Sequence, residues 1–142
     1  MTREEVYRDI EATLGTVPTL FKAVPDDTLE LEWNLFKKVE LRDEVIPDKY
    51  RELMGLAAGA VLGSRFCVAA HRELAKACGA TDEEIEGAVR IAKGVAGWST
   101  YMTGLDLDMN TFRDEIGQIC SYVRSVQGKP MPGETAGRPT AH

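Results

Sequence analysis

Cys67 and His71 are the residues of this chain whose types and spacing most directly suggest chemistry. The residues around them are typical of a helix, and positions four apart on a helix share one face, with Cβ atoms about 5–6 Å apart. An imidazole at that distance can take the proton of a thiol and return it, and the thiolate is the nucleophilic form of cysteine. The pair therefore predicts a reactive thiol with a proton carrier beside it.

Glu52 is a third candidate, on a helix expected over 47–62. From position 53 onward this helix is apolar and rich in small residues, which favours burial and close packing against a neighbour. A buried carboxylate is costly unless it is paired, hydrogen-bonded or neutral. If this helix and the next one, over 64–77, form a tight antiparallel pair, Glu52 approaches His71. A relay then follows in which the thiol of Cys67 is the nucleophile, the imidazole carries the proton, and the carboxylate orients the imidazole or stores its proton.

Each of these residues also has a purely structural interpretation. A free cysteine is often a small buried hydrophobic residue, and His71 could be an ordinary core or surface histidine. Glu52 could be an exposed residue that the helix dipole favours near the N-terminus. Ser64 fits the N-cap of its helix, and as a supporting residue its hydroxyl could also hydrogen-bond the thiolate. One Cys, one His and one Glu are too few for a zinc site, and no phosphate loop or dinucleotide motif is present, so neither a metal nor a cofactor is expected.

The rest of the chain predicts an all-α fold. Caps, glycine stops and prolines delimit the segments, and none shows the alternation of a strand. Gly94 and Gly97 weaken helix near Trp98, so a kink or restart is expected there. We expect one all-helical domain over 1–128 and a flexible tail over 129–142, which is rich in Pro and Gly. Helices are expected over 2–15, 28–40, 47–62, 64–77, 81–95 and 109–126, with a short helical turn from 18.

Composition narrows the class of protein. The chain has 142 residues and a net charge of −6, without the basic surface that nucleic acid requires. Its longest uncharged apolar stretch, 53–63, is about half a membrane span, and the N-terminus has no secretory signal. Three cysteines without regular spacing make no disulfide framework, so a cytoplasmic location is expected. The apolar surface of 53–62 and 94–102 exceeds what one thin helical layer can cover, which favours a homo-oligomer.

A resemblance to a known family follows from these residues. Glu52, Ser64, Cys67 and His71, the phrase Val-Ala-Ala-His-Arg-Glu-Leu-Ala and the segment 79–85 resemble the carboxymuconolactone decarboxylase and alkyl hydroperoxidase D superfamily. The resemblance runs from about position 39 to 111. It implies an alkyl hydroperoxidase D-like helical bundle, usually assembled as a trimer or hexamer, and thiol-dependent peroxide reduction.

The chain departs from the redox branch of this family, whose pattern is Glu, then Cys-X-X-Cys-X-X-X-His. Ser64 stands where the first cysteine is expected, and Phe66 stands where the hydroperoxidase has a second histidine. A serine cannot close a disulfide after peroxide attack. Cys78 lies eleven residues after Cys67, about 16 Å along a helix, which is too far for a disulfide. Cys120 belongs to another expected helix. A one-cysteine cycle remains, in which a sulfenic acid is reduced by an external thiol.

Three functions are compatible with the sequence. The first is a peroxiredoxin-type antioxidant oxidoreductase that acts on a peroxide through Cys67. The second is a decarboxylase or isomerase of a small organic acid or lactone, with His71 and Glu52 as acid and base and Arg65 or Arg72 holding a carboxylate. The third is a non-catalytic helical oligomer in which an ancestral site has decayed.

Overall fold

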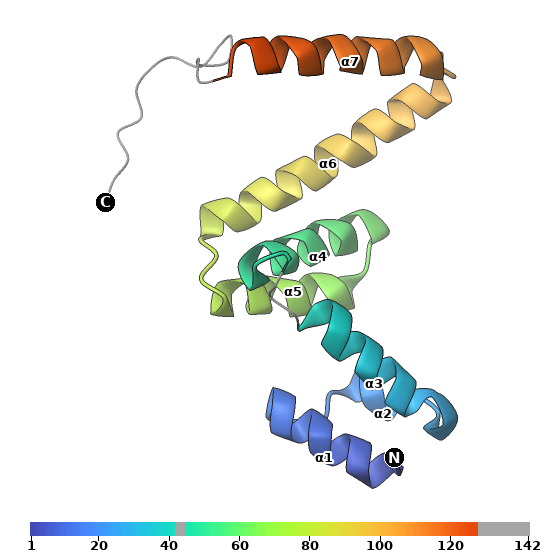
Figure 1. The fold of residues 1–142 in the computed structure, drawn as a ribbon, viewed down its shortest axis with the longest axis vertical. Coiled ribbons are helices and arrows are strands. Elements are labelled where there is room, and N and C mark those ends of the chain that lie inside the picture. Colours follow the sequence, from blue (N-terminus) through green and yellow to red (C-terminus); the bar gives the residue numbers. More distant parts are fainter. Residues whose placement is uncertain (42–44, 128–142) are drawn as a thin grey trace. The chain divides into compact units, whose positions relative to one another are not determined.

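The described part of the protein is helical. The structure is a computed structural model that describes residues 1–41 and 45–127, and it contains seven helices and no strand in those ranges (Figure 1). The all-α prediction is confirmed, whereas the expected tail over 129–142 lies outside the described residues. None of the described helices is long and apolar enough to cross a membrane. The helices are α1 Arg3–Leu14, α2 Thr19–Lys22, α3 Asp26–Glu40, α4 Asp48–Leu62, α5 Arg65–Ala77, α6 Asp82–Gly104 and α7 Met109–Ser125.

The chain forms two compact units, 1–97 and 98–142. The first contains α1 to α5 and most of α6, and the second contains the end of α6 and α7. The expectation of a single domain over 1–128 stays a prediction.

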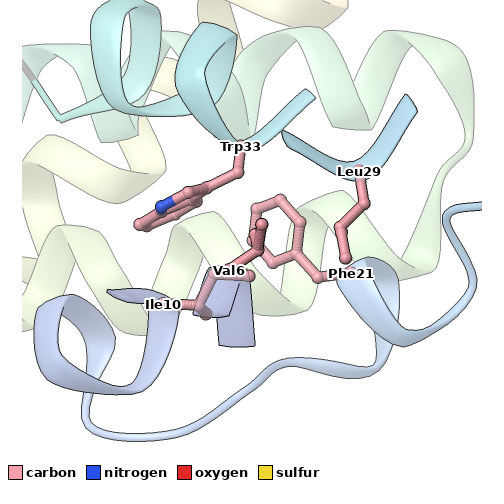
Figure 2. Packing of buried hydrophobic residues seen from close by; sticks show 5 residues of the cluster. All are labelled: Val6, Ile10, Phe21, Leu29 and Trp33. Atoms are coloured by element: carbon pink, nitrogen blue, oxygen red, sulfur yellow. The ribbon is translucent and has the colours of Figure 1, made fainter. Parts of the chain in front are cut away.

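Helices α1 to α3 share a core of large side chains, which Figure 2 shows from close by. The ring of Phe21 meets that of Trp33 edge to face, with centroids 5.2 Å apart, a geometry that favours aromatic pairs. The indole N–H of Trp33 donates to Asp9 over 2.7 Å, and the ammonium of Lys37 donates to the same carboxylate oxygen. The fully buried residues of this core are Val6, Ile10, Phe21, Leu29 and Trp33.

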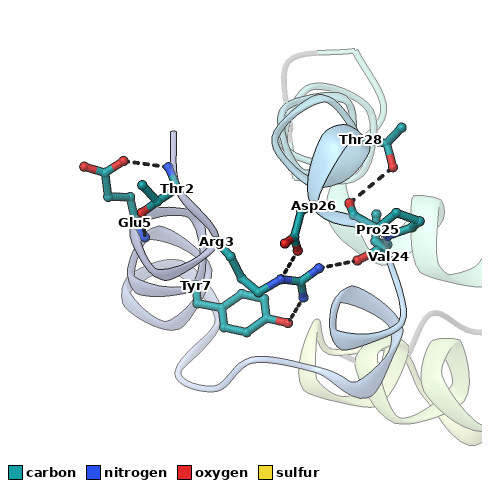
Figure 3. Close-up of polar contacts among 8 residues, drawn as sticks. All are labelled: Thr2, Arg3, Glu5, Tyr7, Val24, Pro25, Asp26 and Thr28. Atoms are coloured by element: carbon teal, nitrogen blue, oxygen red, sulfur yellow. Dashed lines mark hydrogen bonds and ion pairs between the residues drawn. The ribbon is translucent and has the colours of Figure 1, made fainter.

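Polar contacts fix the start of α1 against the segment that leads into α3 (Figure 3). Thr2 caps α1 in a reciprocal capping box with Glu5. The guanidinium of Arg3 donates to Asp26, to the hydroxyl of Tyr7 and to the carbonyl of Val24. One arginine thus connects the first turns of α1 and α3.

Helices α4 and α5 form a tight hairpin around Gly63 (Figure 1). Gly63 ends α4 with φ at +67°, a left-handed conformation that glycine adopts at no steric cost. Ser64 then starts α5, because its hydroxyl accepts a hydrogen bond from the backbone N–H of Cys67. The expected break at Gly63 and the expected N-cap at Ser64 are both confirmed.

Helix α6 is longer than the sequence indicated. It continues through Gly94 and Gly97 as far as Gly104, so the expected end near Val95 and a restart near Trp98 are wrong. A glycine inside a helix costs only about 1 kcal/mol, and no proline is present to remove a backbone hydrogen bond. Two isolated glycines are therefore too weak to stop this helix.

Candidate functional site

The candidate site lies on the α4–α5 hairpin, where two glycines of α4 let α5 approach closely. A Cβ atom added at Gly55 would lie 2.6 Å from Nδ1 and Cε1 of His71. A Cβ atom added at Gly59 would lie 2.8 Å from Cβ of Cys67 and 3.3 Å from the backbone nitrogen of Val68. Gly55 and Gly59 are one helical turn apart, as are His71 and Cys67. His71 therefore packs against Gly55, and Cys67 packs against Gly59.

Glu52 is hydrogen-bonded to His71, as the antiparallel arrangement predicted. The distance between Oε2 of Glu52 and Nδ1 of His71 is 2.7 Å. Glu52 is 8% exposed, so its carboxylate is buried. Nε of Arg51 lies 3.8 Å from the other carboxylate oxygen. A buried carboxylate is stable in such a place because neighbouring donors and cations compensate for lost water. The interpretation of Glu52 as an exposed first-turn residue is wrong.

The orientation of the imidazole assigns a role to each ring nitrogen. The Cγ–Nδ1–Cε1 edge faces Gly55 and Glu52 on α4. A carboxylate only accepts hydrogen bonds, so the ring donates its Nδ1 proton to Glu52. In the neutral ring Nε2 then carries the lone pair. Such a carboxylate–imidazole pair fixes the tautomer and leaves Nε2 as the proton acceptor.

Cys67 occupies the third position of α5 and is half-buried. Its backbone N–H donates to Oγ of Ser64 over 3.2 Å. The hydroxyl of Ser64 is therefore hydrogen-bonded to the backbone of Cys67. The first turn of a helix carries partial positive charge from its free N–H groups, which favours anions. Cys67 and His71 both face α4, Cys67 at Gly59 and His71 at Gly55.

The other two cysteines differ from Cys67 in their surroundings. Cys78 caps the end of α5, where burial raises the pKa of its thiol and a hydrogen bond to Asp48 raises that pKa further. Cys120 lies exposed on α7. Phe66, at the position of the second histidine in the hydroperoxidase pattern, is 76% exposed, and the guanidinium of Arg65 lies over its ring.

An open groove of about 560 Å³ adjoins the imidazole. His71 lines it, together with residues from the end of α3, the segment before α4, and α4 itself. Cys67 is not among the described residues that line it. The sequence did not indicate this groove, because its walls come from separate segments with no common motif. The lining residues are Lys38, Val39, Glu40, Val45, Ile46, Arg51, Met54, Gly55, Ala58 and His71.

No metal site emerges in the ranges 1–41 and 45–127, where no three His, Cys, Asp or Glu side chains are grouped to hold an ion. The chemistry available in these residues is that of a thiol, an imidazole and a carboxylate.

The fold and the site define a class: an all-helical protein with a buried carboxylate–imidazole pair on a hairpin that also carries a cysteine. The chain belongs to the carboxymuconolactone decarboxylase family, whose sequence model matches residues 23–107. It is similar to the crystal structure of the alkylhydroperoxidase AhpD core from Rhodospirillum rubrum, with 23% identity and a TM-score of 0.67, over 75% of this chain and 81% of that chain. At this identity the similarity concerns the fold. No curated protein matches the chain. The resemblance seen in the sequence is confirmed.

Proposed function

We propose that this protein is a thiol-dependent peroxidase-like oxidoreductase with one site cysteine. The observation that carries the proposal is the 2.7 Å hydrogen bond between Glu52 and His71, on a hairpin where Cys67 lies one turn before that imidazole. A carboxylate that fixes Nδ1 leaves Nε2 to accept the proton of a thiol. Membership of the family and the alkylhydroperoxidase-like fold support the same class.

In the first half of the cycle, Nε2 of His71 takes the proton of the Cys67 thiol. The thiolate sulfur attacks the terminal oxygen of a hydroperoxide, and the S–O bond forms as the O–O bond breaks. The leaving alkoxide takes the proton back from His71 and departs as an alcohol. Cys67 is oxidised to a sulfenic acid, and the peroxide is reduced by two electrons. Glu52 stabilises the imidazolium between the two proton transfers.

The second half of the cycle requires two molecules of an external thiol. The first attacks the sulfur of the sulfenic acid, which releases water and leaves a mixed disulfide with Cys67. The second attacks this disulfide, releases an external disulfide and restores the Cys67 thiol. Ser64 stands where a second cysteine would allow an internal disulfide, so the cycle depends on the outside reductant.

A second function is favoured by the groove. His71 lines it, Cys67 is absent from its described lining, and Arg51 and Lys38 supply positive charge at its wall. A small organic acid or lactone in the groove would meet the imidazole and its carboxylate as acid and base, and no thiol would be needed. Such a decarboxylase or isomerase is the alternative. A helical oligomer without turnover is the third.

The substitution Cys67→Ser separates these functions. The full chain is assayed with an organic hydroperoxide and dithiothreitol, and separately with small lactones. We expect Cys67→Ser to reduce peroxide only at the rate seen without protein, and Cys120→Ser, a matched control on α7, to keep the wild-type rate. Lactone turnover that survives Cys67→Ser would assign the decarboxylase or isomerase. Absence of both activities in the wild type would leave the non-catalytic oligomer.

We also propose a reducing, cytoplasmic location and assembly as a homo-oligomer, a trimer or hexamer. The location is supported by three thiols that are all free in the structure. Assembly is supported by the exposure of large apolar side chains on α4 and α6, among them Met54, Leu62, Ile91 and Trp98.

A further inference from the structure

The guanidinium of Arg51 lies beside the buried carboxylate of the candidate site. Nε of Arg51 is 3.8 Å from Oε1 of Glu52. The two residues are consecutive on α4, and consecutive positions on a helix do not normally face each other, so their spacing alone does not produce this contact. The side chain of Arg51 is only 16% exposed. Little water therefore screens the attraction between the two charges.

Glu52 is placed between two groups of different kinds. Its Oε2 is hydrogen-bonded to Nδ1 of His71 over 2.7 Å, whereas its Oε1 faces Arg51. A guanidinium stays protonated throughout the pH range in which proteins work, whereas an imidazole gains and loses a proton within that range. A permanent cation and a switchable one therefore act on the same carboxylate.

The number of protons that the site holds decides whether the proposed relay can start. The relay needs one proton shared between the thiol of Cys67 and Nε2 of His71. A second proton, with the thiol intact and the imidazole already charged, leaves no acceptor for the thiol proton. A buried carboxylate without a cation beside it favours this uptake, because the extra proton neutralises the site. A guanidinium next to Glu52 supplies that compensation without a proton on Nε2.

Other charged groups of the described residues lie around the hairpin. Lys38 and Glu40, at the end of α3, line the same groove as His71 and carry opposite charges. Arg72 follows His71 on α5 and is exposed, so solvent screens its charge. Two further cations are held in ion pairs, Lys49 with Glu84 and Lys76 with Asp82.

Asp48 adds negative charge on α4, one helical turn before Glu52. Its carboxylate is hydrogen-bonded to the thiol of Cys78, and the charges of Glu52 and Arg51 also act on that thiol. A second carboxylate near Glu52 favours proton uptake in the same direction as Glu52 does. The cation of Arg51 opposes both.

We infer that Arg51 is a positioning residue of the proposed peroxidase, whose guanidinium balances the charge of Glu52 and so keeps Nε2 of His71 free to accept the proton of Cys67. The inference rests on the proposed function. Arg51 acts through Glu52 and takes no part in the bonds that form and break during peroxide reduction.

The first test follows the imidazole itself by NMR in the full-length protein at a series of pH values. The chain has one other histidine, His142, so His142→Gln identifies the signal of His71. We expect the ring in Arg51→Met and Arg51→Gln to take up its proton at a pH about one unit higher than in the wild type. Arg51→Lys keeps the charge and should stay close to the wild type. Arg72→Gln, the matched control, removes an exposed charge beside His71 and should change little.

The second test measures peroxide reduction by the same proteins. Near neutral pH, Arg51→Gln should be about tenfold slower than the wild type, and it should recover as the pH is raised. Circular dichroism checks that each variant keeps its helix content, and the two neutral variants differ in polarity, so a packing defect of one does not decide the result.

The two proposals fail in different ways. An imidazole that titrates at the same pH in the wild type and in both neutral variants would overturn the role of Arg51. So would Arg72→Gln that shifts the titration as far as Arg51→Gln does. The NMR measurement needs no turnover, so a wild type that fails to reduce peroxide would contradict the proposed function without deciding the titration.

Discussion

The α1–α3 core and the α4–α5 hairpin solve the problem of close packing in opposite ways. The first fills its interior with large rings, led by Trp33 and Phe21, and keeps its charged contacts near the surface. The second brings two helices together through Gly55 and Gly59 and places a carboxylate and an imidazole at the contact. We therefore expect substitutions in the α1–α3 core to lower the free energy of unfolding and leave the activity of the folded protein unchanged. Substitutions in the α4–α5 hairpin are expected to displace the side chains of the candidate site and so to lower activity.

The largest effect on stability is expected from Trp33→Ala. Removal of a fully buried indole leaves a cavity and costs about 3–5 kcal/mol of unfolding free energy. Asp9 also loses one of its two donors. Chemical denaturation measures the change, and the peroxide-reducing rate per folded molecule should stay unchanged. A variant with full stability would show that this core is not the stabilising region.

Gly55→Ala adds a side chain at the contact between α4 and α5, whereas Trp33→Ala removes one from the α1–α3 core. The new methyl group would overlap the imidazole of His71, so the ring must move away from Glu52. Misplacement by about 1 Å can cost about 10²-fold in rate, and overpacking costs about 1–3 kcal/mol. Gly87→Ala on α6 is the matched control, since its Cβ meets nothing within 4 Å. Equal activity of the two variants would refute the role of close approach.

Glu52→Gln tests the polar half of the hairpin with almost no change of shape. An amide cannot stabilise an imidazolium as a carboxylate does, so part of the roughly 10²–10⁴-fold contribution of proton transfer is lost. We expect peroxide reduction to slow by about tenfold or more, with the helix content and assembly mass unchanged. Steady-state rates at several pH values provide the measurement. An unchanged rate at every pH would remove Glu52 from the mechanism.

The smallest effect concerns acid stability of the α1–α3 core. Two hydrogen bonds hold the pKa of Asp9 below its ordinary value of 3.8. The one from Lys37 has the larger effect and the one from Trp33 the smaller. A carboxyl with a lower pKa in the folded state stabilises the fold above its unfolded pKa, and that contribution is lost as the pH falls through the folded pKa. Unfolding of the wild type should therefore become easier below about pH 4, and Asp9→Asn should flatten that dependence. If the unfolding free energies of the wild type and Asp9→Asn changed with pH in the same way, the prediction would be wrong.

Local signals in the sequence predicted the helix ends that position the site. The glycine at position 63 followed by a serine defines the hairpin turn. Residues 55 and 71 lie equally far from that turn on opposite sides, and residue 52 lies about one helical turn before residue 55, so an antiparallel pair brings Glu52 within reach of His71. The small residues at positions 55 and 59 indicated close approach. The groove could not be predicted, because its lining depends on where α3 ends relative to α4. The full length of α6 was also not predicted. The low helix propensity of Gly94 and Gly97 led to an expected end near position 95, whereas the helix continues to Gly104.

The central claim is that the thiol of Cys67 reacts with peroxide because His71 accepts the thiol proton and Glu52 stabilises the resulting imidazolium. Trapping of sulfenic acid tests it most directly: the full-length protein is treated with one equivalent of hydroperoxide and dimedone, and mass spectrometry locates the adduct. The account predicts an adduct at Cys67, little at Cys78, whose pKa is raised by burial, and much slower formation in His71→Asn. An adduct at Cys67 that forms equally fast in His71→Asn, or none at Cys67 at all, would contradict it.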